Sequence, residues 1–403
     1  MKLGADGDTH LTYCTNIHPG ETWAEVRENL GRYLPAIKQR VAPAQDFGVG
    51  LRLSGTAAQA LAEPAALDEL RDFLTANGLY VFTINGFPYG SFHRTRVKED
   101  VYLPDWQDQE RLHYTNRLAD LLASLLPDDR GIAGSISTVP GAFKPRARSP
   151  EAVERIASLI LQHVTHLVRL HEQSGHTIAL ALEPEPCCVL ETIEETIGFF
   201  KTHLYSRAAV HHLAQKSGLH RDLAEAALRR HLGVCLDLCH AAVEFEDAAT
   251  IIAQLDHAGV RIAKLQVSAG LRIANVTPQA IRSLAPFDDE VYLHQVVEQT
   301  DNGLRRYVDL PEAIHQSDSG LAREWRVHFH VPIFLETLGG FASTQPFVRE
   351  ILAQHRSHPV SSHLEVETYT WDVLPARYRN EAVDLAIARE LDWVKAQLEA
   401  SIP

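Results

Sequence analysis

Acidic, amide and imidazole side chains stand at or near the ends of several short apolar runs in this sequence. In chain order they are Glu183, Asp237, His240, Gln266, His328, His330, Glu365 and Glu367. A carboxylate that ends a buried run carries a desolvation cost, which pairing or metal coordination offsets. Carboxylate oxygens and imidazole nitrogens together form a ligand set for a divalent cation. The sequence therefore predicts a metal site built from these positions.

Some of these positions have close alternatives. Glu185 lies in the same EPEP turn as Glu183, which is the predicted ligand. Glu365 and Glu367 lie on one side of an extended strand because side chains alternate with a period of two, and Glu367 is nearer the strand end. We therefore predict Glu367 as the ligand.

The histidines and the glutamine leave similar choices. His328 and His330 also share one face of a strand, and either can be an ordinary histidine of a loop. We predict His330 as a metal ligand and His328 as a substrate contact. Gln266 is a weak neutral ligand, and a hydrogen-bonded core amide is its alternative role.

The elements that position these residues are strand-length apolar runs separated by helical spacing, such as that of Leu30, Leu34 and Ile37. Alternating strands and helices predict a parallel sheet, and eight such units predict a closed TIM (β/α)8 barrel. In that fold the carboxyl ends of the strands meet at one mouth, which brings the polar residues together. The eight predicted strands are Thr9–Asn16, Phe47–Ser54, Leu79–Gly86, Gly131–Val139, Thr177–Glu185, Gly233–His240, Arg261–Ser268 and His363–Trp371.

Two stretches interrupt the alternation. Residues 192–232 have room for two or three helices where one is needed, and residues 270–326 form an insertion after the seventh strand. Asn302-Gly303 between two alternating pieces predicts a hairpin within that insertion. The strand-like run 326–334 is assigned to the same long connection. We expect one domain over residues 1–403, with the insertion folded over the mouth as a lid.

Composition narrows the class of partner. The formal charge of −14 argues against a nucleic-acid-binding surface and favours a small polar ligand. The five cysteines show no CxxC pair, which is typical of reduced thiols. The chain contains neither an apolar run of membrane-spanning length nor a signal-peptide pattern at its start. We expect a cytoplasmic protein.

Three short motifs carry a family resemblance. LEPEP, GVCLDLCHAA and LEVET resemble the xylose isomerase-like TIM barrels, which include sugar isomerases, ketose 3-epimerases and endonuclease IV-type enzymes. The resemblance implies a divalent metal (Mn²⁺, Mg²⁺, Co²⁺ or Zn²⁺) and a substrate-binding role for His240. The ligands that it implies are Glu183, Asp237, Gln266 and Glu367. Gln266 stands where the family has histidine, so His328 or His330 is expected to supply the nitrogen.

The same resemblance implies a reaction. Glu183 and Glu367, on opposite sides of a bound sugar or cyclitol, would move a proton next to a carbonyl, as in isomerisation or epimerisation. Solvated surface is the alternative role for the basic loop at 93–98. The further candidates for hydrogen bonding to substrate hydroxyls are Arg52, Asn85, His93, Arg94 and His328. A metal-dependent phosphoesterase and a protein that binds and hands over a metabolite are the alternative functions.

A second resemblance extends over most of the chain. HLTYCTNIHPGETW, NGFPYGSFH, VYLHQVVEQ and HLEVETYTWDVLP resemble the EboE family of metabolite traffic proteins, within the same superfamily. This resemblance implies a place in a secondary-metabolite pathway.

Overall fold

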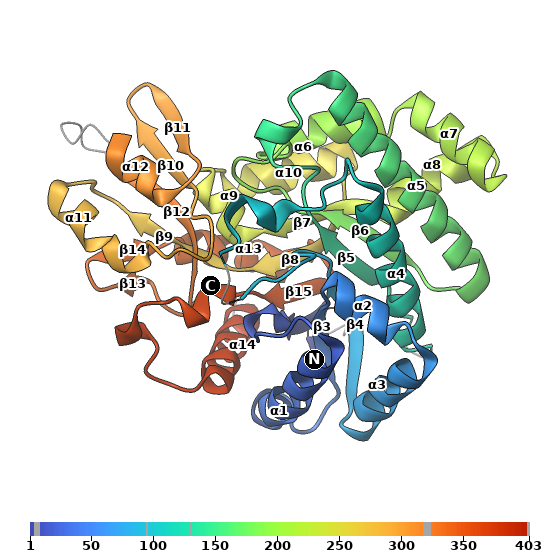
Figure 1. Cartoon of the computed structure of the whole chain (residues 1–403), viewed down its shortest axis with the longest axis horizontal. Coiled ribbons are helices and arrows are strands. Elements are labelled where there is room, and N and C mark those ends of the chain that lie inside the picture. Colours follow the sequence, from blue (N-terminus) through green and yellow to red (C-terminus); the bar gives the residue numbers. More distant parts are fainter. Residues whose placement is uncertain (4–8, 94–95, 129–130, 317–323, 401–403) are drawn as a thin grey trace.

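A closed barrel of parallel strands forms the centre of the molecule (Figure 1). The computed structural model describes residues 1–3, 9–93, 96–128, 131–316 and 324–400. The barrel strands follow the hydrogen-bonded order β2-β15-β8-β7-β6-β5-β4-β3, and a parallel bridge between Cys14 and Gly50 joins β3 to β2. The short strand β1 (Lys2–Leu3) adds to β2 in antiparallel pairing. The fold is therefore the predicted TIM (β/α)8 barrel.

Each barrel strand overlaps one of the predicted runs, so the eight predicted strands are confirmed. The strands are β2 (Thr9–Tyr13), β3 (Phe47–Arg52), β4 (Leu79–Asn85), β5 (Gly134–Thr138), β6 (Ile178–Leu182), β7 (Leu232–Asp237), β8 (Ile262–Val267) and β15 (His363–Val366). Every residue of these strands is buried, as expected for a parallel sheet that helices cover.

Amphipathic helices surround the barrel. In α1, a capping box of Thr22 and Glu25 fixes the first turn, and Leu30, Leu34 and Ile37 bury one face in the main hydrophobic cluster. The three helices α6, α7 and α8 occupy residues 193–231, which confirms the predicted extra helices there. The long helices are α1 (Trp23–Val41), α3 (Pro64–Ala76), α4 (Gln109–Leu125), α5 (Pro150–Ser174), α7 (Arg207–Ser217), α8 (Arg221–His231), α10 (Ala248–Ala258), α13 (Gln345–Ser357) and α14 (Val383–Glu399).

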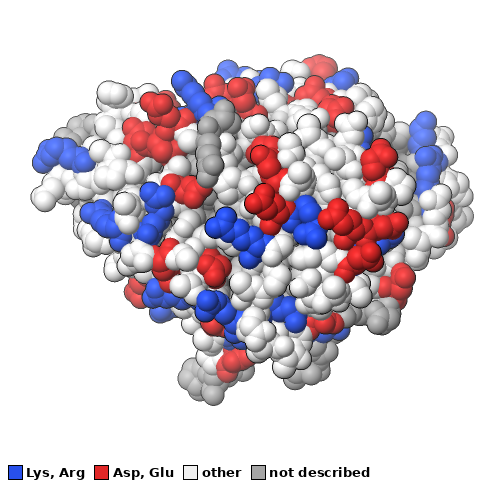
Figure 2. All heavy atoms as spheres, turned by 60° about the horizontal axis from the view of Figure 1, so that its bottom comes forward, with Lys and Arg blue, Asp and Glu red and all other residues white. Residues whose placement is uncertain are grey.

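The shorter helices are α2 (Gly55–Leu61), α6 (Ile193–Phe199), α9 (Leu238–Val243), α11 (Pro278–Ser283) and α12 (Leu310–Gln316). Among the described helices, none combines the length and the apolar character that crossing a membrane requires. Acidic and basic side chains are interspersed over the face shown in Figure 2.

A second, antiparallel sheet is formed by the segment of the chain between β8 and α13. Its order is β11-β10-β12-β9-β14-β13. The assignment of the run 326–334 to this connection is confirmed by β12, although the predicted bounds 270–326 stop short, because β12 and β14 both pair with β9 and extend the insertion through Ser343. The strands are β9 (Ala269–Ile273), β10 (Val296–Thr300), β11 (Gly303–Tyr307), β12 (Glu324–Val331), β13 (Thr337–Leu338) and β14 (Phe341–Ser343).

The predicted hairpin is present, with its turn one residue earlier than expected. Thr300 pairs with Gly303, so Asp301 and Asn302 form the two-residue loop of the β10-β11 hairpin. The Asn302 amide donates to Oγ1 of Thr300 at 3.1 Å, which stabilises this loop. One hydrophobic cluster contains both Leu265 of the barrel and Trp325 of the second sheet. That continuity supports the expectation of a single domain.

Candidate active site and metal centre

Three carboxylates meet at the carboxyl ends of three barrel strands. Glu183 follows β6, Asp237 ends β7 and Glu367 follows β15, and one oxygen of each lies within 4.8 Å of the others. All three residues are buried. Asp237 also caps α9, because its Oδ1 accepts from the His240 amide at 2.9 Å and from Ser268 Oγ at 2.8 Å. The strand ends thus place the predicted carboxylates side by side.

Crowding of these acids opposes their ionisation. Burial raises the pKa of Glu183 well above its usual value, and the charges of Glu367 and Asp237 raise it further. Burial, with the charges of Asp237 and Glu365, raises the pKa of Glu367 to about 7. A bound cation would offset both effects, because it stabilises the ionised form of each acid.

The pattern of unpaired atoms fits a cation. Within the described part of the chain, Glu183 Oε2 and Asp237 Oδ2 are buried and have no hydrogen-bond partner. Buried carboxylate oxygens are normally paired or bound to metal. Glu367 is held by two amides, since its Oε1 accepts from Asn16 Nδ2 at 2.6 Å and from Asn85 Nδ2 at 3.1 Å. The residues present therefore fit a divalent cation with oxygen ligands.

Gln266 lies in the same layer of the barrel. On β8 it pairs in register with Asp237 of β7 and with Glu365 of β15. Its buried Nε2 has no hydrogen bond of ordinary geometry within the described residues, yet the amide lies close enough to Glu367 to lower the pKa of that acid as a donor. Coordination through Oε1 would require the amide to rotate by half a turn. Its role as a ligand remains a prediction.

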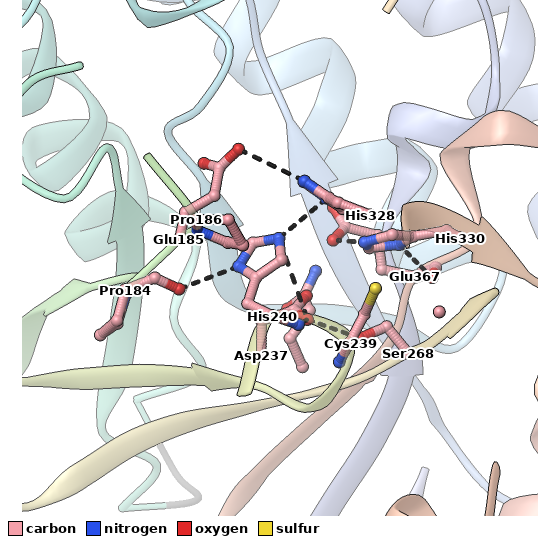
Figure 3. Close-up of polar contacts among 12 residues, drawn as sticks. Pro184, Glu185, Pro186, Asp237, Cys239, His240, Ser268, His328, His330 and Glu367 are labelled. Carbon is pink, nitrogen blue, oxygen red and sulfur yellow. Dashed lines mark hydrogen bonds and ion pairs between the residues drawn. The ribbon is translucent and has the colours of Figure 1, made fainter. Parts of the chain in front are cut away.

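Three histidines lie beside the carboxylates (Figure 3). The ring centroids of His240 and His328 are 4.5 Å apart, and that of His330 lies 5.9 Å from His240 and 5.3 Å from His328. His330 Nδ1 donates to the backbone oxygen of Glu367 at 3.0 Å. Its Nε2 is buried and unpaired within the described residues. Burial lowers the pKa of His330 to about 4, which keeps the ring neutral and able to coordinate.

A cavity opens onto this cluster. Its polar wall consists of Asn16, Asn85, Lys98, Glu183, Glu185, His240, His328 and Glu367. Aromatic and aliphatic side chains complete it, among them Phe87, Phe92, Tyr292, Leu293 and Tyr369. Tyr292 and Leu293 belong to the insertion, between β9 and β10. Part of the insertion therefore lies at the carboxyl-end mouth of the barrel, where a lid is expected.

The predicted substrate contacts Arg52 and His93 make hydrogen bonds to other groups of the protein. Arg52 does not line this cavity within the described residues, because its guanidinium donates to the carbonyls of Gly20, Pro88 and Gly90 and to Glu21 Oε2. His93 contacts Asn16 O at 2.5 Å and Tyr292 Oη at 3.0 Å. Arg94 lies outside the described residues.

Sequence reasoning missed several neighbours of the site. Tyr102 Oη donates to Glu185 Oε1 at 2.7 Å, and Gln295, directly before β10, contacts both Tyr102 and His328. Asn16 stands at the end of the first predicted strand, so the rule that selected Glu183 also applied to it. Gln295 had no comparable signal, because only the packing of the insertion brings it to the mouth.

Comparison with one solved structure supports the fold. No protein-family model matches the sequence, and no curated protein matches it. A xylose isomerase-like TIM barrel protein from Mycobacterium smegmatis, solved in complex with magnesium, matches at 10% identity and TM-score 0.52 over 98% of each chain. A D-tagatose 3-epimerase-like protein matches at 10% identity and TM-score 0.47 over 97% of each chain. The 3-keto-D-glucoside 4-epimerase YcjR of E. coli matches at 13% identity and TM-score 0.43, over 96% of this chain and 99% of that one.

Proposed function

We propose that this protein is a metal-dependent isomerase or epimerase that moves a proton next to the carbonyl of a sugar or cyclitol. The convergence of Glu183, Asp237 and Glu367 beside a cavity that Glu183 and Glu367 line carries the proposal. The three carboxylates, with Gln266 and His330 as further candidates, would hold a divalent cation such as Mn²⁺, Mg²⁺, Co²⁺ or Zn²⁺. When bound, that cation supplies positive charge beside the carbonyl oxygen, where negative charge develops.

The protein's own groups would carry the proton. β7 and β8 lie between β6 and β15 in the sheet order, so Glu183 and Glu367 approach the site from separate strands. One carboxylate would take the proton from the carbon next to the carbonyl, and the other would return a proton to the opposite face or to the adjacent carbon. The amides of Asn16 and Asn85 orient Glu367 for this transfer.

The remaining wall would bind the substrate. His240 Nδ1 donates to the Pro184 carbonyl at 3.0 Å, which leaves its Nε2 as an acceptor for a substrate hydroxyl. Phe87, Tyr292 and Leu293 offer apolar surface to the carbon face of a ring and exclude water from the reacting atoms. A sugar or cyclitol presents this combination of hydroxyls and an apolar face.

The EboE resemblance adds a finer proposal, that the reaction belongs to a secondary-metabolite pathway. Handover of a bound metabolite is the alternative function, and Gln266 in place of a histidine favours it, because an amide is the weaker ligand. Catalysis and handover differ in whether a carbon-bound hydrogen exchanges with solvent.

Solvent exchange tests the proposal directly. Protein loaded with Mn²⁺ is incubated in D₂O with D-fructose, D-tagatose or 2-keto-myo-inositol, and NMR follows deuterium at the carbon next to the carbonyl. We expect exchange by wild type and none by Glu367→Gln. Glu390→Gln is the matched control, because this buried glutamate of α14 accepts from Thr368 and Ile333 through Oε1 alone and lies outside the cavity wall. A metal-loaded wild type that binds these compounds without exchange would establish handover instead.

A further inference from the structure

Gln295 determines which nitrogen of His328 carries a hydrogen. The Gln295 Nε2 donates to Tyr102 Oη at 2.7 Å and to the Pro186 carbonyl at 3.3 Å. A carbonyl can only accept, so the amide nitrogen must face it. The amide oxygen of Gln295 consequently faces His328 Nδ1 at 2.8 Å, and Nδ1 is the donor. In its neutral form His328 therefore has a bare Nε2.

His240 has the same tautomer as His328. Its Nδ1 donates to the Pro184 carbonyl, which leaves its Nε2 bare as well. The two Nε2 atoms lie only 3.1 Å apart, so two lone pairs face each other in a buried place. That arrangement is repulsive unless a positive charge lies between them. Two zinc-nitrogen bonds of about 2.0 to 2.1 Å at a tetrahedral angle would separate the nitrogens by about 3.3 Å, close to what is seen.

Glu185 supplies a third ligand atom. One of its oxygens and one nitrogen of each of His240 and His328 all lie within 4.8 Å of one another. Its Oε1 accepts from Tyr102, whereas its buried Oε2 lacks a hydrogen-bond partner in the described ranges. Metal-bound histidines typically donate their second nitrogen to a carbonyl or carboxylate, and both histidines here do so.

We propose that Glu185, His240 and His328 form a second cation site, separate from the carboxylate site of Glu183, Asp237 and Glu367. Two imidazoles and one carboxylate favour Zn²⁺ over the hard cations that an oxygen set prefers. All three residues line the cavity, so an open coordination position faces the substrate. In the loaded protein, His240 would act on a substrate oxygen through this cation. The inference goes beyond the proposed function and does not depend on it.

Metal stoichiometry tests the second site. The full-length protein is stripped with EDTA, titrated with Zn²⁺ by calorimetry, desalted, and analysed for zinc by mass spectrometry. We expect two ions per chain for wild type. A single ion that His328→Ala retains would overturn the proposal and would mean that a shared proton holds the two imidazoles together.

Variants assign each ion. His328→Ala and Glu185→Leu should each retain one ion, and Asp237→Asn should retain the other, so that adding His328→Ala to Asp237→Asn leaves none. His163→Ala is the matched control: His163 is a buried histidine of α5 with one partnered nitrogen, Nδ1, and it should keep both ions. Circular dichroism confirms folding of each variant. Retention of two ions by both His328→Ala and Glu185→Leu would overturn the proposal.

The outcome is independent of the solvent-exchange experiment. Two bound ions without carbon-hydrogen exchange would leave the second site standing and refute the isomerase. Carbon-hydrogen exchange by a protein whose single ion survives His328→Ala would support the isomerase and refute the second site.

Discussion

Lys264 Nζ lies 2.5 Å from Glu365 Oε2 in the interior of the barrel, and both side chains are fully buried. Glu365 is therefore the partner of a lysine, while Glu367 two residues later reaches the carboxylate cluster. The lysine also affects that cluster, because its charge lowers the pKa of Glu183 and of Glu367 against the larger effect of burial. The lysine of this ion pair thus favours ionised ligands, whereas its partner Glu365 raises the pKa of Glu367.

Lys264→Met should destabilise the protein by about 3 to 5 kcal/mol, because it leaves the Glu365 carboxylate buried without its partner. The double variant Lys264→Met/Glu365→Leu should lose less, since no unpaired charge remains. Urea unfolding in EDTA measures both. A single variant as stable as wild type would contradict the prediction.

Asp237→Asn should weaken binding of the carboxylate-site cation more than about 100-fold, given that changes in outer-shell partners alone cost 10 to 100-fold. The fold should persist, because asparagine Oδ1 can still accept from the His240 amide and from Ser268. Competition with a fluorescent chelator for Mn²⁺ measures the affinity. An unchanged affinity would exclude Asp237 as a ligand.

Glu367→Gln should reduce turnover by about 10² or more in any exchange reaction that wild type catalyses, because an amide cannot take up a proton at neutral pH. Metal content must be determined on the same samples, since the change also removes a candidate ligand. Activity restored to the wild-type level by excess Mn²⁺ would show that Glu367 binds metal without transferring the proton.

The barrel and the carboxylate cluster were predictable for the same reason. Each strand forms from a local apolar run, and parallel strands place their carboxyl ends at one mouth, so Glu183, Asp237 and Glu367 meet once the strands are recognised. Alternation places Glu365 and Glu367 on the same side of the strand. The position of Glu367 nearer the strand end indicates that it is the one that reaches the mouth.

What the sequence did not reveal depends on non-local packing. The insertion reaches Ser343 because β12 and β14 both pair with β9, and no local pattern specifies those partners. Gln295 reaches His328 only through that sheet. Arg52 ends a strand as the true cluster residues do, yet its guanidinium turns to loop carbonyls whose positions cannot be read from spacing.

Arg52→Lys separates a structural role from substrate binding. A lysine cannot donate simultaneously to Gly20, Pro88 and Gly90, so we expect a loss of about 1 to 3 kcal/mol in the free energy of unfolding. The affinity for metal and for any bound ketose should change less than about threefold. Thermal unfolding and ligand titration of the same preparation measure the two effects. Weak ketose binding at unchanged stability would show instead that Arg52 binds the substrate.

Glu390 gives the stability of the protein a defined pH dependence. Burial raises the pKa of this α14 glutamate from 4.5 to about 7, although its carboxylate accepts from Thr368 and from the Ile333 amide. The folded state therefore binds the Glu390 proton more tightly than the unfolded state does. The stabilising contribution is fully present below about pH 4.5, declines as the pH rises toward 7, and is lost above it.

Glu390→Gln should remove this dependence, because glutamine resembles the protonated acid and its Oε1 can accept both hydrogen bonds. At pH 8 the variant should exceed wild type by roughly 1 to 3 kcal/mol, since a shift of about one pKa unit corresponds to 1.36 kcal/mol. At pH 4.5 the difference should shrink toward zero. Urea unfolding of both proteins in EDTA from pH 4.5 to 8 measures it, and parallel stability curves for the two proteins would show that Glu390 ionises alike in the folded and unfolded states.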